Sequence, residues 1–587
     1  MKFYKYFVLT LLIFSTTFSA ISTQAKEIKR DSHEHLNINP DNTHVQIMGE
    51  NEGVVSDGVI RILAIGNSFS QDAVETYLYE LAKNAGQSVV IGNLYIGGAS
   101  LDLHWKNASV NKAAYSYRKI GLDGKKVTLD KTSIETAVAD EEWDYISFQQ
   151  ASSFSGQYNT FVTPLPLLYN YVKQKTTNPE VKYILHQTWA YAKNSTHKGF
   201  ANYNNNQGAM YSAIVDAVGR AKDLIKADLL VPAGTAIQNG RNSILGDNFT
   251  RDGYHLDVNI GRYTAACTWF EAIFGKSVIG NPFKPDALSD YEAKIAQYAA
   301  HSAVMKPNEV TRSEPNKADS ISIAKVKWKK QKVEKGVIWK QAHFNDLYEA
   351  QQEINILEVD LRKKNINIDF AGLASGLKVT SDFVKEENAI GGINGSYFDM
   401  KNGGSTTFFK IDNKVINEGR TLSGSKPDVR LNGAITIDTD VKGKEIIDIL
   451  EGTVSDHLWP TKIEASNVMV CGPLLIMNDT LVTMLKNPFN NNRHPRSAVA
   501  ISGNKLILIT VDGRNNQAYG MSLPELAFFL KQIGAEKALN LDGGGSTTLV
   551  LNTPKKQGIL NYPSDNKKFD HEGERPAANV ILIKQKR

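Results

Sequence analysis

Residues 60–70 read IRILAIGNSFS, an apolar run followed by a glycine turn and a serine. The apolar run is typical of a buried strand, and Ser68 begins a helix with an apolar face that includes Val74 and Leu78. A serine at this junction would place its hydroxyl at the carboxyl edge of a sheet and its N–H group at a helix terminus, where an oxyanion is stabilised. The pattern predicts a nucleophile at Ser68, although a serine at a helix start is most often only an N-cap.

Strand-like apolar runs alternate with helical patterns from residue 59 to about residue 279. Because such alternation is typical of βαβ crossovers, we expect a parallel sheet covered by helices on both faces. The predicted strands cover residues 60–65, 88–95, 145–148, 183–185 and 229–231.

The 587 residues divide into five expected segments. We expect a signal peptide at 1–25, because Lys2 and Lys5 precede a short apolar run and Ala25 ends a small, polar stretch. A polar tail at 26–57, a first domain at 58–300, a Lys-rich linker at 301–335 and a second domain at 336–587 follow. The signal peptide predicts a secreted or periplasmic protein.

Composition excludes several classes of protein. With 42% hydrophobic and 22% charged residues the chain is globular, and the formal net charge of +5 falls to +3 without Lys2 and Lys5. That charge is too weak to predict a nucleic-acid partner, and no stretch is apolar for long enough to predict a membrane span. We expect Cys267 and Cys471 to be buried free thiols, because they lie on apolar faces of different domains.

The motif RDGYH at residues 251–255 supplies partners for the serine. Asp252 and His255 lie three residues apart before an apolar helix, so His255 could act as the base and Asp252 could orient its ring. A second turn, GGAS at residues 97–100, follows the second strand.

In this order, the motifs of residues 58–280 resemble the SGNH (GDSL-like) hydrolases. The resemblance implies an α/β three-layer sandwich, with Ser68 as nucleophile, Gly98 as a backbone oxyanion donor, His255 as base and Asp252 as its partner. The sequence departs from the family pattern at Asn67, where aspartate is usual, and it lacks the G-x-N-D block. Gln149 offers a side-chain amide as the third oxyanion donor instead.

The second domain combines short strands and Gly-rich turns with a helix that starts at the capping box of Ser522 and Glu525. We expect an α+β fold with a mixed sheet. The turn DGGGSTT at residues 542–548 follows a strand, and its N–H groups could hold an anion. Other strand-end clusters are NGSYFD (394–399), HPR (494–496), DGR (512–514) and RPAAN (575–579). One such turn is usually a solvated hairpin, but five in one domain indicate a site.

The set GGINGSYFD, CGPLL, HPRSAVAI, VDGR, LNLDGGGSTT and ERPAANVI, between residues 354 and 583, is similar to the phosphodiester glycosidase family. That family includes the lysosomal uncovering enzyme and bacterial relatives linked to exopolysaccharide. The resemblance implies hydrolysis of a sugar-1-phosphodiester at the anomeric carbon. The expected site residues are Arg496, Arg514, Arg575, Gly543, Gly544 and Ser546 for the phosphate, Asn394 for a sugar hydroxyl, and Asp399, Asp512 or Asp542 as the carboxylate.

These patterns predict an exported bifunctional hydrolase that acts on a polysaccharide or glycoconjugate, with an O-deacetylase first and a phosphodiester glycosidase second. No cofactor or metal is predicted, although a metal at the three carboxylates stays open. The main alternative is a glycan-binding protein in which one or both domains are inactive. A further alternative makes the first domain a lipid or thioester hydrolase.

Overall fold

The computed structural model describes residues 58–419, 430–441 and 443–586. The expected signal peptide and polar tail lie outside these residues. Among the helices of these three ranges, none combines the length and apolarity needed to cross a membrane.

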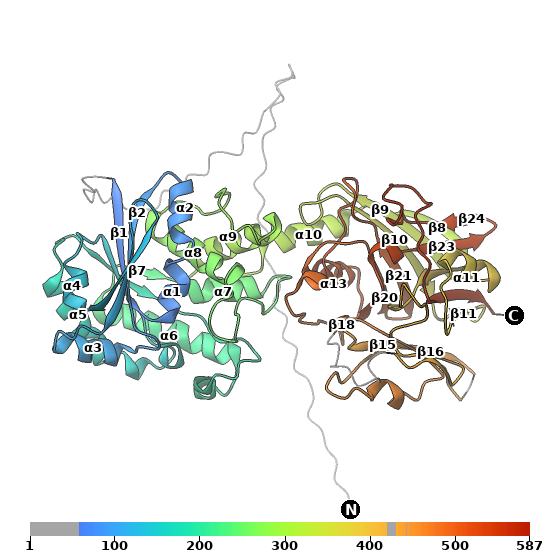
Figure 1. Ribbon diagram of the computed structural model, residues 1–587, viewed down its shortest axis with the longest axis horizontal. Coiled ribbons are helices and arrows are strands. Elements are labelled where there is room, and N and C mark those ends of the chain that lie inside the picture. Colours follow the sequence, from blue (N-terminus) through green and yellow to red (C-terminus); the bar gives the residue numbers. More distant parts are fainter. Residues whose placement is uncertain (1–57, 420–429, 442, 587) are drawn as a thin grey trace, which may run out of the picture. The chain divides into compact units, whose positions relative to one another are not determined.

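A seven-stranded sheet forms the centre of the N-terminal domain, in the order β4-β3-β2-β1-β5-β6-β7 (Figure 1). Five of its strands run parallel, which confirms the predicted parallel sheet. The strands are β1 (Val59–Gly66), β2 (Ser88–Tyr95), β3 (Tyr115–Ile120), β4 (Lys126–Thr132), β5 (Tyr145–Phe148), β6 (Lys182–His186) and β7 (Leu229–Val231).

Two groups of helices pack on this sheet and give the expected α/β three-layer sandwich. One group comprises α1 (Ser68–Val74), α2 (Leu78–Asn84), α7 (Ala233–Arg241), α8 (Ile260–Phe274) and α9 (Asp290–Met305). The other comprises α3 (Leu101–Ser109), α4 (Ile134–Val138), α5 (Pro164–Lys175) and α6 (Gln207–Ile225).

The hairpin β3–β4 is an addition that the sequence patterns did not predict. Its strands pair antiparallel with each other and with β2, so the sheet is parallel only on one side. Nearly all of β4 is exposed, because an edge strand with polar side chains buries little apolar surface.

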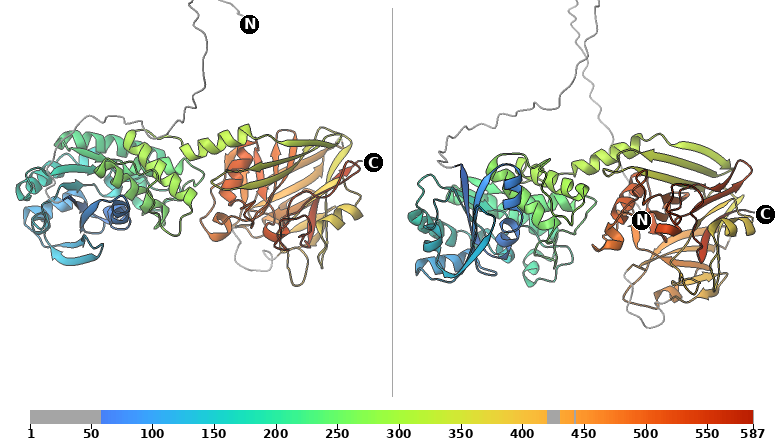
Figure 2. Two further views of the ribbon diagram at one scale, coloured as in Figure 1. Left: turned by 90° about the horizontal axis from the view of Figure 1, so that it is seen from above. Right: turned by 45° about the horizontal axis from the view of Figure 1, so that its top comes forward.

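Three sheets make up the C-terminal domain, and all their pairings are antiparallel. The α+β class is confirmed, but the expected mixed sheet is wrong: connections as short as Ser502–Lys505 join neighbouring strands, and a parallel pair would need a long crossover. Figure 2 shows these strands in layers. The eight-stranded sheet contains β19 (Thr480–Leu481), β18 (Leu474–Met477), β22 (Lys537–Asn540), β20 (Arg496–Ser502), β21 (Lys505–Val511), β10 (Gln352–Asp360), β9 (Val337–Phe344) and β8 (Lys329–Glu334).

The two five-stranded sheets complete this domain. One contains β11 (Ile366–Gly372), β25 (Asn579–Gln585), β12 (Gly391–Asn394), β23 (Leu549–Thr553) and β24 (Lys556–Ile559). The other contains β14 (Lys414–Asn417), β13 (Phe409–Ile411), β17 (Asn467–Cys471), β15 (Gly433–Thr439) and β16 (Glu445–Glu451). One apolar core draws side chains from all three sheets, among them Leu357, Ile368 and Ile435.

The helices associated with this part of the chain are α10 (Glu314–Lys325), α11 (Thr380–Glu386), α12 (Pro488–Asn491) and α13 (Leu523–Gln532). The capping box that starts α13 forms as predicted between Ser522 and Glu525. Residues 301–335, expected to be a linker, contain α10 and β8. Cys267 and Cys471 are buried and free.

Candidate functional site

Ser68, His255 and Asp252 meet at the carboxyl end of β1. Ser68 is the first residue of α1, and its Oγ lies 3.0 Å from Nε2 of His255. Nδ1 of His255 lies 2.7 Å from Oδ2 of Asp252. The three side chains therefore form a continuous hydroxyl–imidazole–carboxylate chain, the geometry in which a base can take the serine proton.

The carboxylate of Asp252 is held in its ionised form. Burial disfavours the charge, but hydrogen bonds from the His255 ring and from the N–H groups of His255 and Tyr254 outweigh it, so the pKa of Asp252 lies below its ordinary value. A charged Asp252 fixes the Nδ1–H tautomer of His255 and leaves Nε2 free to accept the proton of Ser68.

The N-cap of α1 is Asn67 rather than Ser68. Oδ1 of Asn67 accepts the N–H of Phe69 at 2.9 Å, which leaves the Ser68 hydroxyl to face His255. Nδ2 of Asn67 donates to the carbonyl of Ala99 at 2.9 Å. An ionised aspartate could not donate this second bond, so the departure from the SGNH pattern has a structural use: it ties the turn of Gly98 to the serine turn.

Gly98 has a φ of +68° and is exposed beside this tie. In the described chain, no hydrogen bond involves the N–H group of Gly98 or of Ser68. Both N–H groups therefore lack a partner within the described residues, and the oxyanion role expected of Gly98 stays a prediction.

Gln149 is held in one orientation by a chain of hydrogen bonds. Because Oδ1 of Asn67 accepts from Phe69, the 2.8 Å contact from Gln149 must come from its Nε2 donor. Oε1 of Gln149 then faces Nδ1 of His186 at 2.7 Å, so His186 carries its proton on Nδ1. Burial lowers the pKa of His186 to about 3, and this ring stays neutral. One N–H of the Gln149 amide donates to Oδ1 of Asn67. The other N–H is the donor that the predicted oxyanion role would use.

Gly66 is required by close approach. A Cβ at this position would lie 2.5 Å from Oγ of Ser70 and 3.0 Å from Cδ of Gln149. Any larger residue would push the Gln149 amide away from Asn67.

A buried carboxylate, Asp72 on α1, holds the loop that carries His255. Oδ2 of Asp72 accepts the N–H of Leu256 at 2.8 Å and lies 3.2 Å from Nη1 of Arg251. Oδ1 lies 2.7 Å from Nη2 of Arg262. The Asp72 side chain is fully buried, so the cluster locks residues 251–256 against the helix of the serine.

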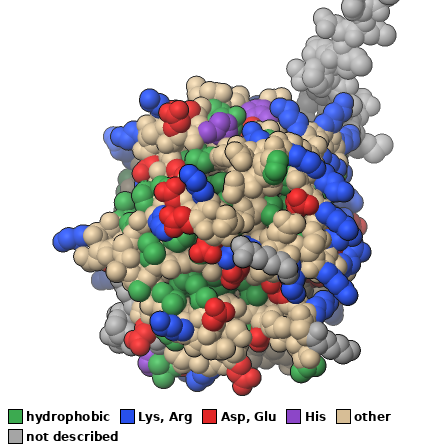
Figure 3. Space-filling model, turned by 90° about the vertical axis from the view of Figure 1, so that its right-hand side faces the viewer, with side chains coloured by type: hydrophobic (Ala, Val, Ile, Leu, Met, Phe, Trp, Pro, Cys, Tyr) green, Lys and Arg blue, Asp and Glu red, His purple; other side chains and the backbone are tan. Residues whose placement is uncertain are grey.

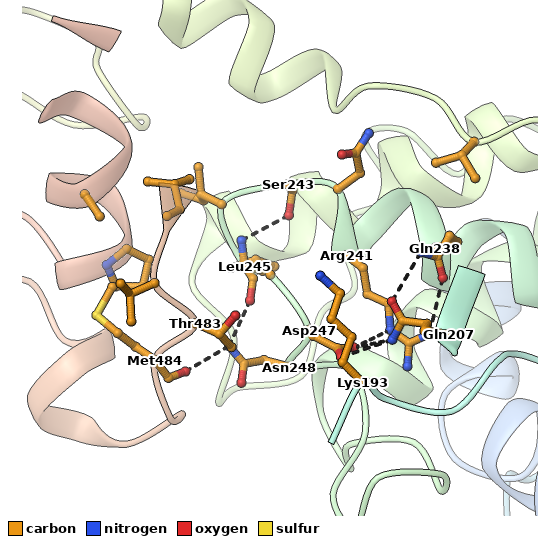
Figure 4. Close-up of a pocket in the computed structure, with 18 residues that line it drawn as sticks. Lys193, Gln207, Gln238, Arg241, Ser243, Leu245, Asp247, Asn248, Thr483 and Met484 are labelled. Atoms are coloured by element: carbon orange, nitrogen blue, oxygen red, sulfur yellow. Dashed lines mark hydrogen bonds and ion pairs between the residues drawn. The ribbon is translucent and has the colours of Figure 1, made fainter. Parts of the chain in front are cut away.

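A second cluster holds the beginning of the same loop (Figure 4). Asp247 accepts the N–H of Lys193 at 2.7 Å and the Gln207 amide at 3.0 Å, and its Oδ1 lies 2.7 Å from Nε of Arg241. The donors surround the carboxylate, so this cluster is structural.

We predict that Asp72→Ala destabilises the N-terminal domain by about 2 kcal/mol or more, because it leaves the buried N–H of Leu256 without an acceptor and removes the carboxylate that Arg251 and Arg262 share. Thermal unfolding measures the loss, and hydrogen exchange should show faster exchange of the Leu256 amide. Asp216→Ala is the control, since Asp216 forms an exposed i,i+4 pair with Arg220 and should change stability by less than about 0.5 kcal/mol. Equal effects of the two variants would contradict the assigned role of Asp72.

In the C-terminal domain the glycine turn after β22 lies against three arginines. A Cβ on Gly544 would meet Nη2 of Arg514 at 2.9 Å, and one on Gly545 would collide with Nη2 of Arg575. A Cβ on Gly543 would lie 3.8 Å from Cδ of Arg496. The turn needs glycine because guanidinium groups occupy the space of its side chains.

The expectation that this turn cradles phosphate with its own N–H groups is corrected for Gly543 and Gly544. The N–H of Gly543 donates to Oδ1 of Asp542 at 3.0 Å, and the N–H of Gly544 donates to the carbonyl of Pro495 at 2.8 Å. Ser546 is buried beneath the turn. The N–H groups of Gly543 and Gly544 are therefore not free to bind an anion.

Arg514 is the most available of the three arginines. It is exposed, and its guanidinium makes no hydrogen bond or ion pair with the residues of the described ranges. Its backbone has a φ of +62°, a strained conformation for a residue with a side chain. Such strain occurs at functional sites, where the fold holds it in place.

Arg575 and Arg496 are partly occupied. Nε of Arg575 donates to Oδ1 of Asp565 at 3.0 Å. Arg496 is buried, and its Nε and Nη2 donate to carbonyls of Met521, Phe489 and Asn492. The expected phosphate role of Arg496 is thus corrected to one that holds the site together, with its charge close by.

The three candidate carboxylates differ in their surroundings. Burial raises the pKa of Asp542 to about 6, against the opposing effects of Ser546, the Gly543 N–H and the Arg575 charge. Asp512 is fully buried: Oδ1 accepts from Asn561 and Tyr562, and Oδ2 has no partner in the described chain. Burial raises the pKa of Asp512 to about 7. Asp542 is therefore the carboxylate that an arginine of the cluster affects, and Asp512 is bonded to Asn561 and Tyr562 instead.

Asp399 and Asn394 also have structural partners. Oδ1 of Asp399 accepts N–H groups of Lys401 and Asn402 in its own turn. Asn394 is fully buried, and its amide bonds Ser497, the N–H of Thr548 and the carbonyl of Asp542. The expected contact of Asn394 with a sugar hydroxyl is corrected, because this amide instead positions the strand that precedes the glycine turn.

His494 is a candidate that the sequence analysis quoted within a motif but did not select. Its Nδ1 is buried without a partner in the described residues. Burial, followed by the charges of Arg496 and Arg514, lowers the pKa of His494. A neutral ring beside two guanidinium groups could donate to or accept from a substrate. Within the described chain no group of three or more acidic, His or Cys side chains could hold a metal.

We predict that Asp512→Asn reduces the pH dependence of stability. Its folded pKa of about 7 exceeds the unfolded value of about 3.9, so the folded state holds a proton that the unfolded state releases between these values. This group therefore destabilises the fold as pH rises from 4 to 7. Urea unfolding measures the free energy of unfolding at pH 5 and at pH 8, and this energy should decrease less between the two pH values in Asp512→Asn than in wild type. Asp102→Asn, at an exposed site, is the control and should behave as wild type. Parallel curves for Asp512→Asn and wild type would contradict the assignment.

Two family models match separate parts of the chain. One, a domain of unknown function (DUF4886), matches residues 61–303, and the other, phosphodiester glycosidase, matches residues 387–584. A crystal structure of a DUF4886 family protein from Bacteroides uniformis is 52% identical, covering 43% of this chain and 98% of that chain, with a TM-score of 0.43.

The curated relatives of the C-terminal part all carry the same enzyme name. Mouse N-acetylglucosamine-1-phosphodiester alpha-N-acetylglucosaminidase is 30% identical over 182 residues, which is 30% of this chain and 33% of the mouse protein. The catalytic domain of the zebrafish enzyme, auto-inhibited by its pro-peptide, has 20% identity and a TM-score of 0.34, covering 44% of this chain and 88% of that chain.

The chain combines an α/β domain with a phosphodiester glycosidase domain, which confirms the second resemblance. Through its N-terminal domain it belongs to the DUF4886 family. It spans about a third of the length of the curated relatives it matches.

Proposed function

We propose that this chain is a hydrolase with two active sites that process one decorated glycan or glycoconjugate. The N-terminal site would be a serine esterase that removes O-acetyl groups, and the C-terminal site would hydrolyse a sugar-1-phosphodiester. The observation that carries the proposal is the 3.0 Å contact between Ser68 Oγ and His255 Nε2 in line with Asp252. Export, as the sequence of residues 1–25 indicates, belongs to the proposal.

The esterase step follows from the geometry of the triad. Oγ of Ser68 attacks the acyl carbon while His255 Nε2 takes the hydroxyl proton, and the N–H groups of Ser68 and Gly98 receive the oxyanion. Collapse breaks the ester C–O bond, and His255 gives the proton to the departing sugar oxygen, which leaves as a hydroxyl group. Water then attacks the acyl-enzyme by the same route and releases the acid and free Ser68.

We predict that Ser68→Ala lowers the rate of acetate release from acetylated xylan or p-nitrophenyl acetate by about 10³-fold or more. Ser109→Ala, at an exposed serine of the same domain, should retain wild-type rates. Labelling with a fluorophosphonate should modify wild type and spare Ser68→Ala. If wild type binds acetylated glycan but shows neither turnover nor labelling, the N-terminal domain is a binding module.

The second reaction needs charge stabilisation more than protonation. Cleavage of the bond between the anomeric carbon and oxygen leaves the electron pair on a phosphomonoester, which Arg514 and Arg575 can neutralise. Water supplies the hydroxyl group at the anomeric carbon and its proton is released. An ionised Asp542 would stabilise the positive charge that develops on the sugar ring. The family match of residues 387–584 supports this assignment.

We predict that Arg514→Gln in the full chain reduces release of N-acetylglucosamine from an N-acetylglucosamine-1-phosphodiester by about 10²-fold, since it removes a charged donor. Because Arg514 is exposed, the fold should persist, which circular dichroism would check. Arg362→Gln is the control, since Arg362 bonds only its neighbour Asp360. Unchanged sugar release in Arg514→Gln would show that the phosphate lies elsewhere.

A further inference from the structure

Six of the eleven residues in KVKWKKQKVEK, at positions 325–335, are lysines, and Glu334 is the one acid. All six lysines are exposed. Within the described ranges none of them forms an ion pair, whereas Lys340 on the next strand pairs with Glu358. The segment therefore carries uncompensated positive charge.

The geometry of β8 aligns part of this charge on one face. Lys330 and Lys332 lie opposite Lys340 and Ile338 of β9, before the register shift at Val333, so they project from the same face, about 7 Å apart. Lys330 lies directly opposite Lys340 of β9. β8 is the edge of its sheet, and among the strands of the described residues only β9 pairs with it.

A hairpin from a different sheet adds two more lysines. Nε2 of Gln331 donates to the carbonyl of Lys555 at 3.4 Å, and Nζ of Lys555 lies 3.5 Å from the carbonyl of Lys332. Nζ of Lys556 lies 5.3 Å from the centre of the Trp339 ring. We call this set the lysine patch: Lys325, Lys327, Lys329, Lys330, Lys332, Lys335, Lys555 and Lys556. In Figure 3 Lys and Arg side chains gather in a band along one side of the face shown.

The patch is a local excess rather than a property of the whole chain, whose 67 basic and 62 acidic residues nearly balance. Protection of an edge strand from aggregation needs one or two charges. The eight lysines come from the end of α10, from β8 and the residues that flank it, and from the hairpin at Lys555; they repel one another, and an anionic partner would remove that cost.

The chemistry of the patch favours a flexible polymer over a membrane or a nucleic acid. Within the described ranges no large apolar side chain is exposed at residues 325–340 or 550–560, so nothing there would insert into a bilayer. The Trp339 ring, which could stack on a base, faces Lys556. Lysines are mobile point charges, which suit a polyanion without fixed geometry.

We propose that the lysine patch binds an anionic polysaccharide and holds it on the C-terminal domain. The choice of a polysaccharide rests on the proposed function, since a glycan joined through phosphodiesters carries one negative charge per linkage. The binding itself needs no catalysis, and it can be measured in a protein that is inactive at the glycosidase site.

The test measures binding of the full chain carrying Arg514→Gln to dextran sulfate, with uncharged dextran as the reference. We expect binding to dextran sulfate alone, with an affinity that falls as salt rises because counterions are released. Adding Lys330→Glu and Lys332→Glu should weaken binding at least tenfold and reduce the salt dependence. The matched control adds Lys112→Glu and Lys276→Glu, two exposed lysines of the N-terminal domain, and should stay within about twofold.

Equal losses in the two double variants would overturn the proposal, because the effect would then come from net charge alone. Equal binding to dextran and dextran sulfate would also overturn it. Phosphatidylglycerol vesicles and duplex DNA serve as competitors: tighter binding to either than to dextran sulfate would assign the patch to a membrane or a nucleic acid instead. None of these outcomes depends on turnover. A failure of the proposed glycosidase activity would be seen in the sugar-release assay and not in these binding measurements.

Discussion

The geometry of the N-terminal site depends on one buried carboxylate. Asp72 bonds Arg251, Arg262 and the backbone of Leu256, and it stands on the same short helix as Ser68. A buried charge needs fixed polar partners in place of water. If α1 moved away from the loop of residues 251–256, the Asp72 carboxylate would lose these partners. The contact between serine and histidine, which lie 187 positions apart, is a consequence of this constraint.

The C-terminal site uses the same physics with opposite charges. Arg496 is buried, and main-chain carbonyl groups accept its hydrogen bonds without cancelling its charge, so its positive field persists near the glycine turn. Arg514 remains exposed next to it. The buried guanidinium holds the surrounding main chain together, and the exposed one is open to solvent.

The sequence was sufficient for features that depend on local pattern. The parallel strands, the serine turn and the pairing of Asp252 with His255 each follow from residues at the end of one element. The amide orientation of Gln149 and the burial of Asn394 and Asp512 could not be predicted, because each depends on a partner that only the tertiary fold supplies, such as His186, Ser497 or Asn561. The cap at Asn67 is local, since its partner is Phe69, but Ser68 beside it is an equally good capping residue by type. The β3–β4 hairpin escaped prediction because its second strand is polar and exposed, without an apolar period.

The left-handed backbone conformation of Arg514 lowers the stability of this protein. Glycine would adopt that conformation freely, and relief of a steric penalty on the order of 1 kcal/mol would favour it in any selection for robustness alone. A lineage that kept only the fold would therefore drift toward glycine there. The arginine found there places a guanidinium beside Gly544 at this steric cost, and the rest of the fold has to offset it.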